Sequence, residues 1–246
     1  MLTRLPDSFS ALVLGASGGI GSAMIDALLA SERPGQVIGV SRQETYRSDP
    51  RFESLVLDIS EANGLSALER HLKQRAVHFV FNAIGMLHDS ASGITPEKKL
   101  VDLDAETMAR LFHVNAITPA LLLKALENNL KGRHPTLFAS LSARVGSIGD
   151  NRLGGWYAYR ASKAAHNMLM KTAAVELRRL NPEGVIVCLH PGTTDTPLSL
   201  PFQERVPEGK LFTPALVAER LLAVLNDLPM QQSGLFMDWA GKPVPW

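Results

Sequence analysis

A tyrosine and a lysine four residues apart, Tyr159 and Lys163, are the side chains in this sequence with the clearest chemical potential. Residues at this spacing share one face of a helix. A phenol titrates near ~10, too high to exchange protons efficiently at neutral pH. A neighbouring ammonium group favours the phenolate and lowers the phenol pKa. The pair therefore predicts an acid/base for a carbonyl or alcohol oxygen, and the same lysine could hold ribose hydroxyls.

A glycine-rich turn lies near the start of the chain, after the apolar run that ends at Leu14. Its glycines at 15, 19 and 21 allow a tight turn and let backbone N–H groups approach a pyrophosphate without a Cβ in the way. The turn precedes a helical pattern, whose N-terminus favours an anion. The turn therefore predicts dinucleotide binding, and the residues expected to contact the dinucleotide there are Gly15, Ser17, Gly19, Ile20 and Gly21.

Three further positions follow predicted strands. No carboxylate follows the second strand to hold ribose hydroxyls, but Arg42 does follow it and can pair with a 2′-phosphate, so NADP(H) is favoured over NAD(H). The alternative for Arg42 is a solvated surface arginine. Asp58 and Ile59 end the third strand, where the carboxylate can accept from an adenine amino group. Asn82 and Ala83 end the fourth, where small residues leave room for a ribose.

The elements that must position these residues alternate along the whole chain. Apolar runs predict strands buried on both faces, at Ser10–Gly15, Gln36–Val40, Ser54–Leu57, Val77–Asn82, Thr136–Leu141, Gly184–Leu189 and Gly234–Met237. Helical patterns occupy Gly19–Ser31, Ala62–Arg75, Asp104–Asn129, Trp156–Asn181 and Thr213–Leu228. This alternation predicts an α/β fold, a Rossmann-type doubly wound parallel sheet flanked by helices, in a single domain over residues 1–246.

Two stretches without regular pattern, Asp89–Lys99 and Ser199–Lys210, are long for plain connections and are candidate substrate loops.

Composition excludes several classes of protein. Of the 246 residues, 46% are hydrophobic and 20% charged, and the net charge is +1, with no basic stripe for nucleic acid and no polybasic patch for a membrane. No apolar run approaches the ~18 residues of a membrane span and no signal peptide is apparent, so we expect a cytoplasmic protein. The one cysteine, Cys188, and the seven histidines show no metal-binding spacing, and no GxSxG motif supports a serine hydrolase.

Over nearly its whole length the chain resembles the short-chain dehydrogenase/reductases, closest to a C-factor-like subgroup that includes carbonyl reductases. The resemblance is carried by the glycine turn 15–21, Asp58, Asn82-Ala83-Ile84-Gly85, Asn115, Tyr159 with Lys163, and Pro191-Gly192 followed by Thr193 and Thr196.

The resemblance implies a role for each of these positions. Tyr159 would be the acid/base, Lys163 would lower its pKa and bind ribose, and Asn115 would position a water in a proton relay. Pro191, Gly192, Thr193 and Thr196 would run past the nicotinamide. The family also implies a small-molecule carbonyl or alcohol substrate, and a homodimer or homotetramer built from the two long helices.

The chain departs from the family pattern at three places. Leu14 stands where the family has Thr, and Asn82 is preceded by Phe81 rather than a second Asn. The family commonly carries a Ser-Ser pair after the fifth strand, the second serine being catalytic, and here the pair is Ser142-Ala143. Ser142 is our candidate for orienting the substrate oxygen.

The combined motifs predict reversible hydride transfer between a nicotinamide and a carbonyl carbon. The C-factor resemblance and the displaced serine leave open a cofactor-binding signalling or regulatory protein with little turnover. A sugar-nucleotide epimerase or dehydratase is disfavoured, because the segment after Pro191 is short for a nucleotide-sugar domain.

Overall fold

The computed structural model describes residues 1–228 and 232–246. Their main feature is a seven-stranded parallel sheet with the strand order β3-β2-β1-β4-β5-β6-β9. The strands are β1 (Phe9–Leu14), β2 (Pro34–Ser41), β3 (Phe52–Val56), β4 (Phe79–Asn82), β5 (Thr136–Leu141), β6 (Gly184–His190) and β9 (Leu235–Asp238). Each of the seven predicted apolar runs contributes one of these strands, and the predicted doubly wound parallel sheet is confirmed.

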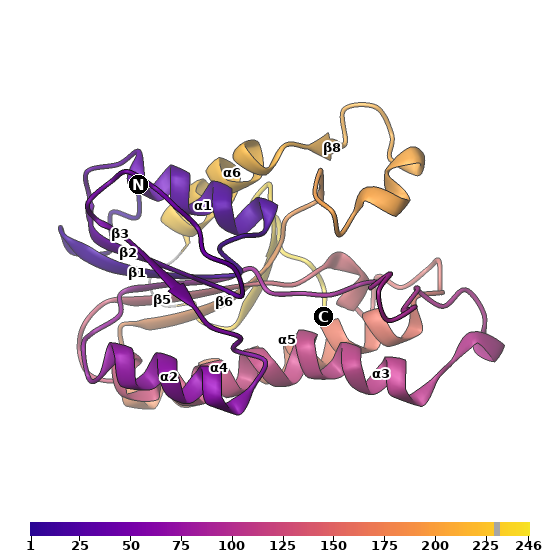
Figure 1. Cartoon of the computed structure of the whole chain (residues 1–246), viewed down its shortest axis with the longest axis horizontal. Coiled ribbons are helices and arrows are strands. Elements are labelled where there is room, and N and C mark those ends of the chain that lie inside the picture. Colours follow the sequence, from indigo (N-terminus) through magenta and orange to yellow (C-terminus); the bar gives the residue numbers. More distant parts are fainter. Residues whose placement is uncertain (229–231) are drawn as a thin grey trace.

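Helices cover both faces of the sheet (Figure 1). On one face lie α1 (Gly19–Leu29) and α6 (Pro214–Asp227), which pack against each other. On the other face lie α2 (Ala62–Leu72), α4 (Thr118–Leu130) and α5 (Tyr157–Leu180). Because helices cover both faces of this parallel sheet, neither face meets water, and this explains why the strands are apolar throughout.

Alternate side chains of each strand enter two different cores. In β1, Ala11 and Val13 belong to the core beneath α1 and α6, whereas Leu12 and Leu14 belong to the core beneath α2, α4 and α5. All four side chains are essentially inaccessible to water. Burying a leucine or valine side chain in this way contributes about 1.5–3 kcal/mol to stability.

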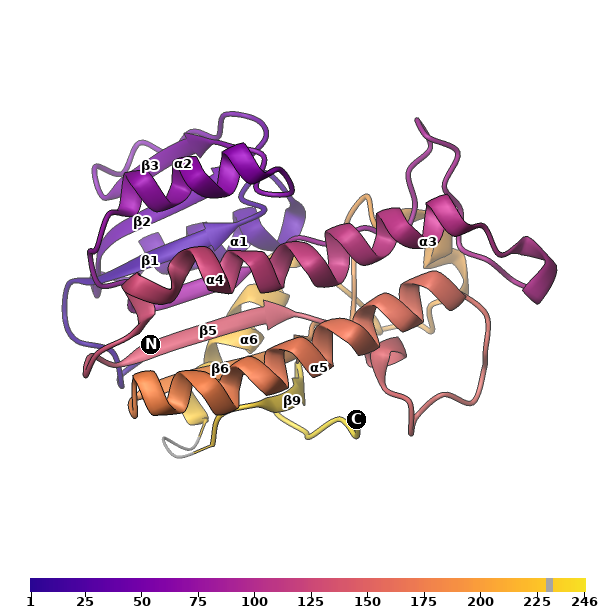
Figure 2. The same ribbon diagram turned by 90° about the horizontal axis from the view of Figure 1, so that it is seen from below.

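The predicted helix over Asp104–Asn129 differs from the structure. Asp104 caps α3 (Ala105–Phe112), its side chain accepting from the N–H of Thr107. A five-residue π turn, η2 (His113–Ile117), then separates α3 from α4. Figure 2 shows α3 and α4 following one another beside α5. π turns occur frequently at functional sites, and this one contains Asn115.

The segment after β6 is more ordered than the predicted loop at Ser199–Lys210. It contains a 3₁₀ helix, η4 (Leu200–Arg205), between two short paired strands, β7 (Thr193–Thr194) and β8 (Leu211–Phe212). Two further 3₁₀ turns, η1 (Leu100–Asp102) and η3 (Arg144–Gly146), precede α3 and α5.

The chain reverses its direction of winding between β1 and β4, which are neighbours in the sheet. Ligands of open α/β sheets bind outside the carboxyl ends of the strands at such a switch point. The glycine turn follows β1 and Asn82 ends β4, so the fold places both predicted cofactor motifs there. None of the described helices is long and apolar enough to cross a membrane.

Candidate active site

Tyr159 and Lys163 lie on the buried face of α5, together with Ser162, His166 and Asn167. Tyr159 is 7% exposed and Lys163 only 3%. The lysine Nζ lies 5.9 Å from the centroid of the tyrosine ring and donates a hydrogen bond to the carbonyl oxygen of Leu141 at 3.0 Å. The helix therefore brings the predicted acid/base pair together at the end of β5.

Burial dominates the ionisation of both groups. It raises the pKa of Tyr159 well above its usual value, and it lowers the pKa of Lys163 to about 8. The direction for Tyr159 is opposite to that expected from Lys163. The physical reason is that burial destabilises the phenolate by removing it from water, and this effect is larger than the stabilisation by an ammonium at this distance. Tyr159 is therefore a protonated phenol at neutral pH, and Lys163 remains mostly an ammonium below about pH 8.

Asn115, in the π turn, fastens the segment after β4 to this pair. Its amide nitrogen donates to the carbonyl oxygen of Met86, and its side-chain oxygen accepts from the Met86 N–H, both at 2.8 Å. It also donates to the Ser162 hydroxyl at 3.1 Å. A Cβ built on Gly85 would lie 3.4 Å from Lys163 Nζ and 3.5 Å from Asn115 Oδ1. Asn115 and Lys163 therefore converge on one point of the site.

The glycine turn has the close approaches that its sequence predicts. Gly15 has φ +79°, and a Cβ on Gly21 would lie 2.2 Å from the Gly15 carbonyl oxygen. Among the described residues, no hydrogen-bond acceptor contacts the N–H groups of Ser17, Gly19, Ile20 or Gly21. These N–H groups stand at the N-terminus of α1, where the helix dipole favours an anion.

The segment that starts at Pro191 reaches this turn from the far end of the chain. A Cβ on Gly19 would lie 2.7 Å from Thr196 Cγ2, so these two residues are in close contact. Gly192 has φ +76° and packs closely on the rings of Phe212 and Trp239. Thr193 is half-buried beside it in β7. The fold thus assembles the predicted 191–196 segment beside the glycine turn.

Arg42 and Asp58 follow neighbouring strands, β2 and β3. Arg42 is exposed and makes no ion pair with any described residue. Asp58 accepts from the hydroxyl and the N–H of Ser60, at 2.6 and 3.0 Å, and these hydrogen bonds chiefly lower its pKa, with a smaller contribution from Arg42. Ile59 is buried beneath this turn. An anionic Asp58 and an Arg42 without an ion pair among the described residues therefore lie at the carboxyl-end edge of the sheet, after neighbouring strands.

Asn82 is engaged within the protein. Its amide donates to Ser140 Oγ at 2.9 Å, and its oxygen accepts from the Ile84 N–H at 3.2 Å. The Ala83 N–H donates to the Leu14 carbonyl oxygen. The Asn82 side chain therefore ties β4 to β5.

Ser142 is buried and points toward α5. Its hydroxyl donates to Asn167 Oδ1 at 2.6 Å. Asn167 lies two helical turns beyond Tyr159, so the hydroxyl would have to leave Asn167 to orient a substrate at Tyr159. Ala143, in contrast, packs in the apolar cluster that contains Tyr159. The substrate-orienting role of Ser142 stays a prediction.

An apolar cluster surrounds Tyr159, and the sequence patterns did not reveal its composition. Its members come from five segments, which are the connection after β4, α3, the turn after β5, the start of α5 and the stretch between β7 and β8: Met86, Leu87, Ile94, Met108, Leu111, Ala143, Val145, Trp156, Ala158, Leu198 and Phe202. The Trp156 ring lies 4.9 Å from that of Phe202 and 6.3 Å from that of Tyr159. His88 Nε2 lies 3.2 Å from the carbonyl oxygens of both Pro197 and Leu198. Because the cluster contains Tyr159, a substrate bound at Tyr159 would contact these apolar side chains.

Sequence reasoning also missed a contact made by Arg47. Its guanidinium donates to Ser22 Oγ at 2.6 Å and to Asp26 at 2.5 Å, over the first turns of α1. No local spacing indicates this contact, because the loop after β2 folds back onto a helix that precedes it in the chain.

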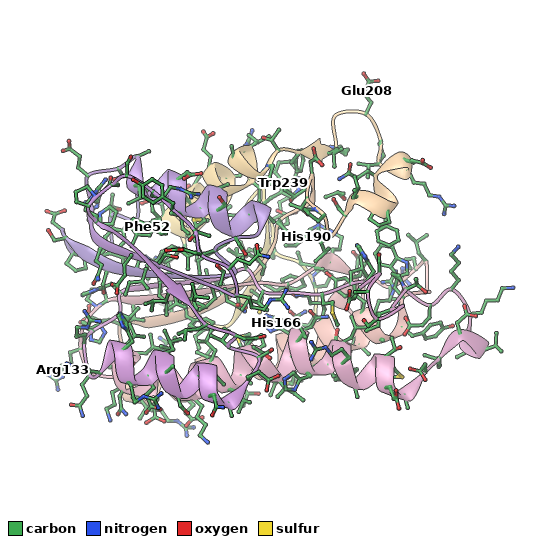
Figure 3. The ribbon with its side chains drawn as sticks, in the orientation of Figure 1. Phe52, Arg133, His166, His190, Glu208 and Trp239 are labelled. Carbon is green, nitrogen blue, oxygen red and sulfur yellow. The ribbon has the colours of Figure 1, made fainter. Side chains whose placement is uncertain are left out.

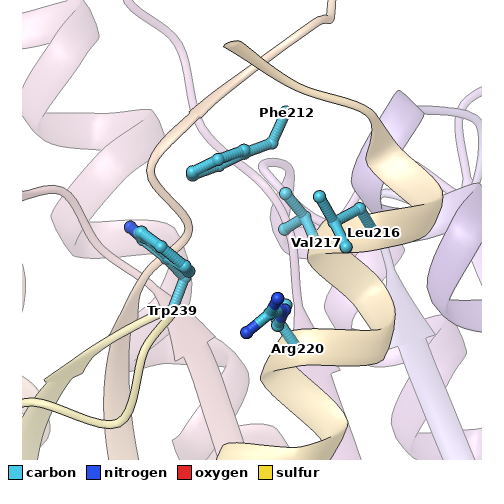
Figure 4. Close-up of a pocket in the computed structure, with 5 residues that line it drawn as sticks. All are labelled: Phe212, Leu216, Val217, Arg220 and Trp239. Atoms are coloured by element: carbon cyan, nitrogen blue, oxygen red, sulfur yellow. The ribbon is translucent and has the colours of Figure 1, made fainter. Parts of the chain in front are cut away.

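Two other features adjoin this assembly. A pocket of about 110 Å³ is lined by Phe212, Leu216, Val217, Arg220 and Trp239, between α6 and β9 (Figure 4). His166, labelled in Figure 3, is buried one turn beyond Lys163, and its pKa is far below normal because of burial. In residues 1–228 and 232–246, no cluster of His, Cys, Asp and Glu could hold a metal ion.

Comparison with known proteins agrees with this geometry. The family described as short chain dehydrogenase matches residues 10–206. The C-signal of Myxococcus xanthus is 38% identical over 148 residues, which cover 60% of this chain and 83% of that protein. A benzil reductase ((S)-benzoin forming) of Saccharomyces cerevisiae is 28% identical over 216 residues, 80% of this chain and 76% of its own. The NADPH-bound carbonyl reductase from chicken fatty liver superposes with a TM-score of 0.83 at 25% identity, over 98% of this chain and 100% of that one.

Proposed function

Because the chain belongs to the short chain dehydrogenase family, we propose that it is an NADPH-dependent carbonyl reductase in which Tyr159 protonates the substrate oxygen. At the level of the family, the chain is an NAD(P)-dependent oxidoreductase that acts on an alcohol or a carbonyl group. The cofactor preference, the direction and the residue roles are the proposal.

The residues around the switch point fit a dinucleotide. The turn at 15–21 has no room for a Cβ at Gly21, and four of its N–H groups lack an acceptor among the described residues. Gly15, Ser17, Gly19, Ile20 and Gly21 would hold the pyrophosphate there. Asp58 and Ile59 would contact the adenine, Asn82 and Ala83 a ribose through their backbone, and Pro191, Gly192, Thr193 and Thr196 the nicotinamide half. When bound, the nicotinamide donates the hydride that reduces the carbonyl carbon.

The proposed preference for NADP(H) rests on Arg42. Among the described residues its guanidinium makes no ion pair, and no carboxylate directly follows β2 in the sequence to hold ribose hydroxyls. A guanidinium pairs with a phosphate through charge-assisted hydrogen bonds. The similar chicken liver carbonyl reductase binds NADPH, which agrees with this preference.

Tyr159 is proposed to transfer its phenolic proton to the carbonyl oxygen as the alkoxide forms. A buried phenol with a raised pKa is protonated at neutral pH, so it is ready to act as a general acid. The Lys163 ammonium stabilises the phenolate that remains and binds ribose hydroxyls. Asn115 would position the water that returns a proton to the pair, since its oxygen and Lys163 Nζ converge near Gly85.

The observation that carries the proposal is the meeting of Tyr159, Lys163 and Asn115 at the edge where the glycine turn lies. The test is a reductase assay with NADPH and a panel of uncharged aldehydes, ketones and diketones that includes benzil, following the absorbance of NADPH. Oxidation of NADPH that depends on a carbonyl substrate is expected. Tight NADPH binding without oxidation on the whole panel would contradict reductase function.

We also propose that two copies pair through α4 and α5. Both helices carry apolar side chains that remain exposed, namely Ile117 just before α4, Leu121 on it, and Met168 and Val175 on α5. Sedimentation of the purified protein tests this: a dimer or tetramer is expected, and a monomer at micromolar concentration would contradict it.

A second candidate, a cofactor-binding signalling protein with little turnover, is favoured by the similarity to the C-signal and by the engagement of Ser142 with Asn167. It predicts tight NADPH binding with no oxidation on the carbonyl panel, so the same assay separates the two.

A further inference from the structure

We propose that Glu97 is a positioning residue whose buried carboxylate fixes the start of α5. It thereby positions Tyr159 and Trp156, which both contribute to the proposed substrate site. The inference rests on the proposed function, since it explains how that site is held. Glu97 belongs to the connection after β4, far from α5 in the sequence.

Glu97 is 4% exposed, which is unusual for a carboxylate. Both of its carboxylate oxygens lie 3.3 Å from the N–H of Ala158, the residue before Tyr159. Its backbone carbonyl oxygen accepts from the N–H of Trp156 at 2.6 Å. One residue thus satisfies two of the N–H groups at the start of this helix.

The start of α5 needs such an external partner. The residue at its N-cap, Trp156, has no capping hydrogen bond from its own side chain, and the first turn contains no acidic residue. Trp156 also adopts the left-handed conformation, with φ +52°, and Gly154 and Gly155 before it have positive φ as well. A bulky residue in this region is strained, so contacts from outside the segment must hold it.

The charge of Glu97 points to the same role. Within the described parts of the chain, no lysine, arginine or histidine forms an ion pair with it. The favourable charge that faces the carboxylate is the N-terminus of α5, where the helix dipole is positive. A buried carboxylate is costly unless it is hydrogen-bonded, so packing alone does not account for a glutamate here.

The connection that carries Glu97 is fastened to the acid/base machinery at both ends. Asn115 holds it at Met86 through two hydrogen bonds of 2.8 Å, and α5 holds it at Glu97. Between these anchors, Leu87 and Ile94 enter the apolar cluster around Tyr159. Glu97 therefore fixes one wall of the site relative to Tyr159.

The consequence for catalysis is selective. Losing the Glu97 carboxylate frees the Ala158 N–H, so the phenol of the next residue and the indole ring that lies beside Phe202 are held less firmly. Even a small displacement of a reacting group lowers the reaction rate strongly. Cofactor contacts at the glycine turn and at Arg42 come from other elements and are expected to be unaffected.

The test compares Glu97→Ala, Glu97→Gln and Asp104→Ala in the full chain. Asp104 is the matched control, because it is an exposed carboxylate that caps α3 and does not contact α5 through that bond. The measurements are kcat and KM for a carbonyl substrate, Kd for NADPH, and hydrogen–deuterium exchange of the peptide over residues 154–162.

We expect Glu97→Ala to lower kcat/KM at least about tenfold, to raise the substrate KM, to leave Kd for NADPH within about twofold, and to speed exchange in 154–162. Glu97→Gln keeps an oxygen acceptor for Ala158 and should restore most of the loss. Asp104→Ala should keep kcat and KM. Unchanged exchange in Glu97→Ala overturns the proposal, as does faster exchange with unchanged kcat/KM. If the parent chain has no turnover, the proposed function is contradicted rather than the role of Glu97. In that case, faster exchange of residues 154–162 in Glu97→Ala supports the positioning role, and unchanged exchange overturns it.

Discussion

The Ser142 hydroxyl donates to the Asn167 side-chain oxygen at 2.6 Å, while the next residue, Ala143, belongs to the apolar cluster that contains Tyr159. Asn167 in turn approaches the Gly146 carbonyl oxygen at 3.5 Å, so Ser142 and Asn167 hold the segment after β5 against α5. The hydroxyl nearest in sequence to the expected position is therefore engaged within the protein, and the next residue, Ala143, carries only a methyl group.

This arrangement predicts the effects of two substitutions. Ala143→Ser should raise kcat by about tenfold or more, because a hydroxyl donor near the developing alkoxide stabilises it. Ser142→Ala should destabilise the fold by about 1–3 kcal/mol, because the Asn167 acceptor is left buried, and its effect on kcat tests the predicted substrate-orienting role. Steady-state kinetics and urea unfolding measure both. A Ser142→Ala variant that loses turnover completely would assign the substrate-orienting role to Ser142.

Lys163 should destabilise the folded protein at neutral pH. Its pKa is lowered from 10.5 to about 8 by burial, so between these values the unfolded chain binds more protons than the folded one, and stability rises with pH. The cost is present in full below pH 8 and disappears above 10.5. Lys163→Met should therefore be more stable than the parent at pH 7, by about 1–3 kcal/mol, and the difference should shrink as pH rises.

Urea unfolding of both proteins across this pH range measures that difference, and Lys163→Met should also lose reductase activity. Equal stability of the two proteins at pH 7 would mean that the ammonium is better solvated than its burial indicates.

Cofactor preference should depend on Arg42. Arg42→Ala should raise KM for NADPH about tenfold and leave KM for NADH within about twofold, because only NADPH carries the phosphate that the guanidinium would bind. Arg133, an exposed arginine far from this edge in Figure 3, provides a control as Arg133→Ala. Equal loss with both cofactors would show that Arg42 acts on a shared part of the nucleotide.

Much of the fold follows from local pattern. Seven apolar runs became seven strands, because a sheet covered on both faces requires continuous apolar sequence. The glycine spacing at 15–21 and the Tyr159–Lys163 pair are equally local, and their neighbourhood in space follows from the strand order.

The parts that sequence reasoning missed depend on contacts between distant segments. The π turn around Asn115 does not change the apolar period, so 104–129 resembled one helix. Glu97 looked like an ordinary charged loop residue, and its burial appears only when the connection after β4 packs on α5. The direction of the Tyr159 pKa was also missed, because local spacing shows the nearby ammonium but not the loss of water.

The most direct test of the account is a comparison of the parent chain with Tyr159→Phe in NADPH titration and in NADPH oxidation with a carbonyl substrate. The phenylalanine keeps the ring packed against Trp156 and removes only the transferable proton. We predict an unchanged Kd for NADPH and a loss of turnover of about 10²–10⁴-fold. Turnover within about tenfold of the parent would contradict the assignment of Tyr159 as the proton donor.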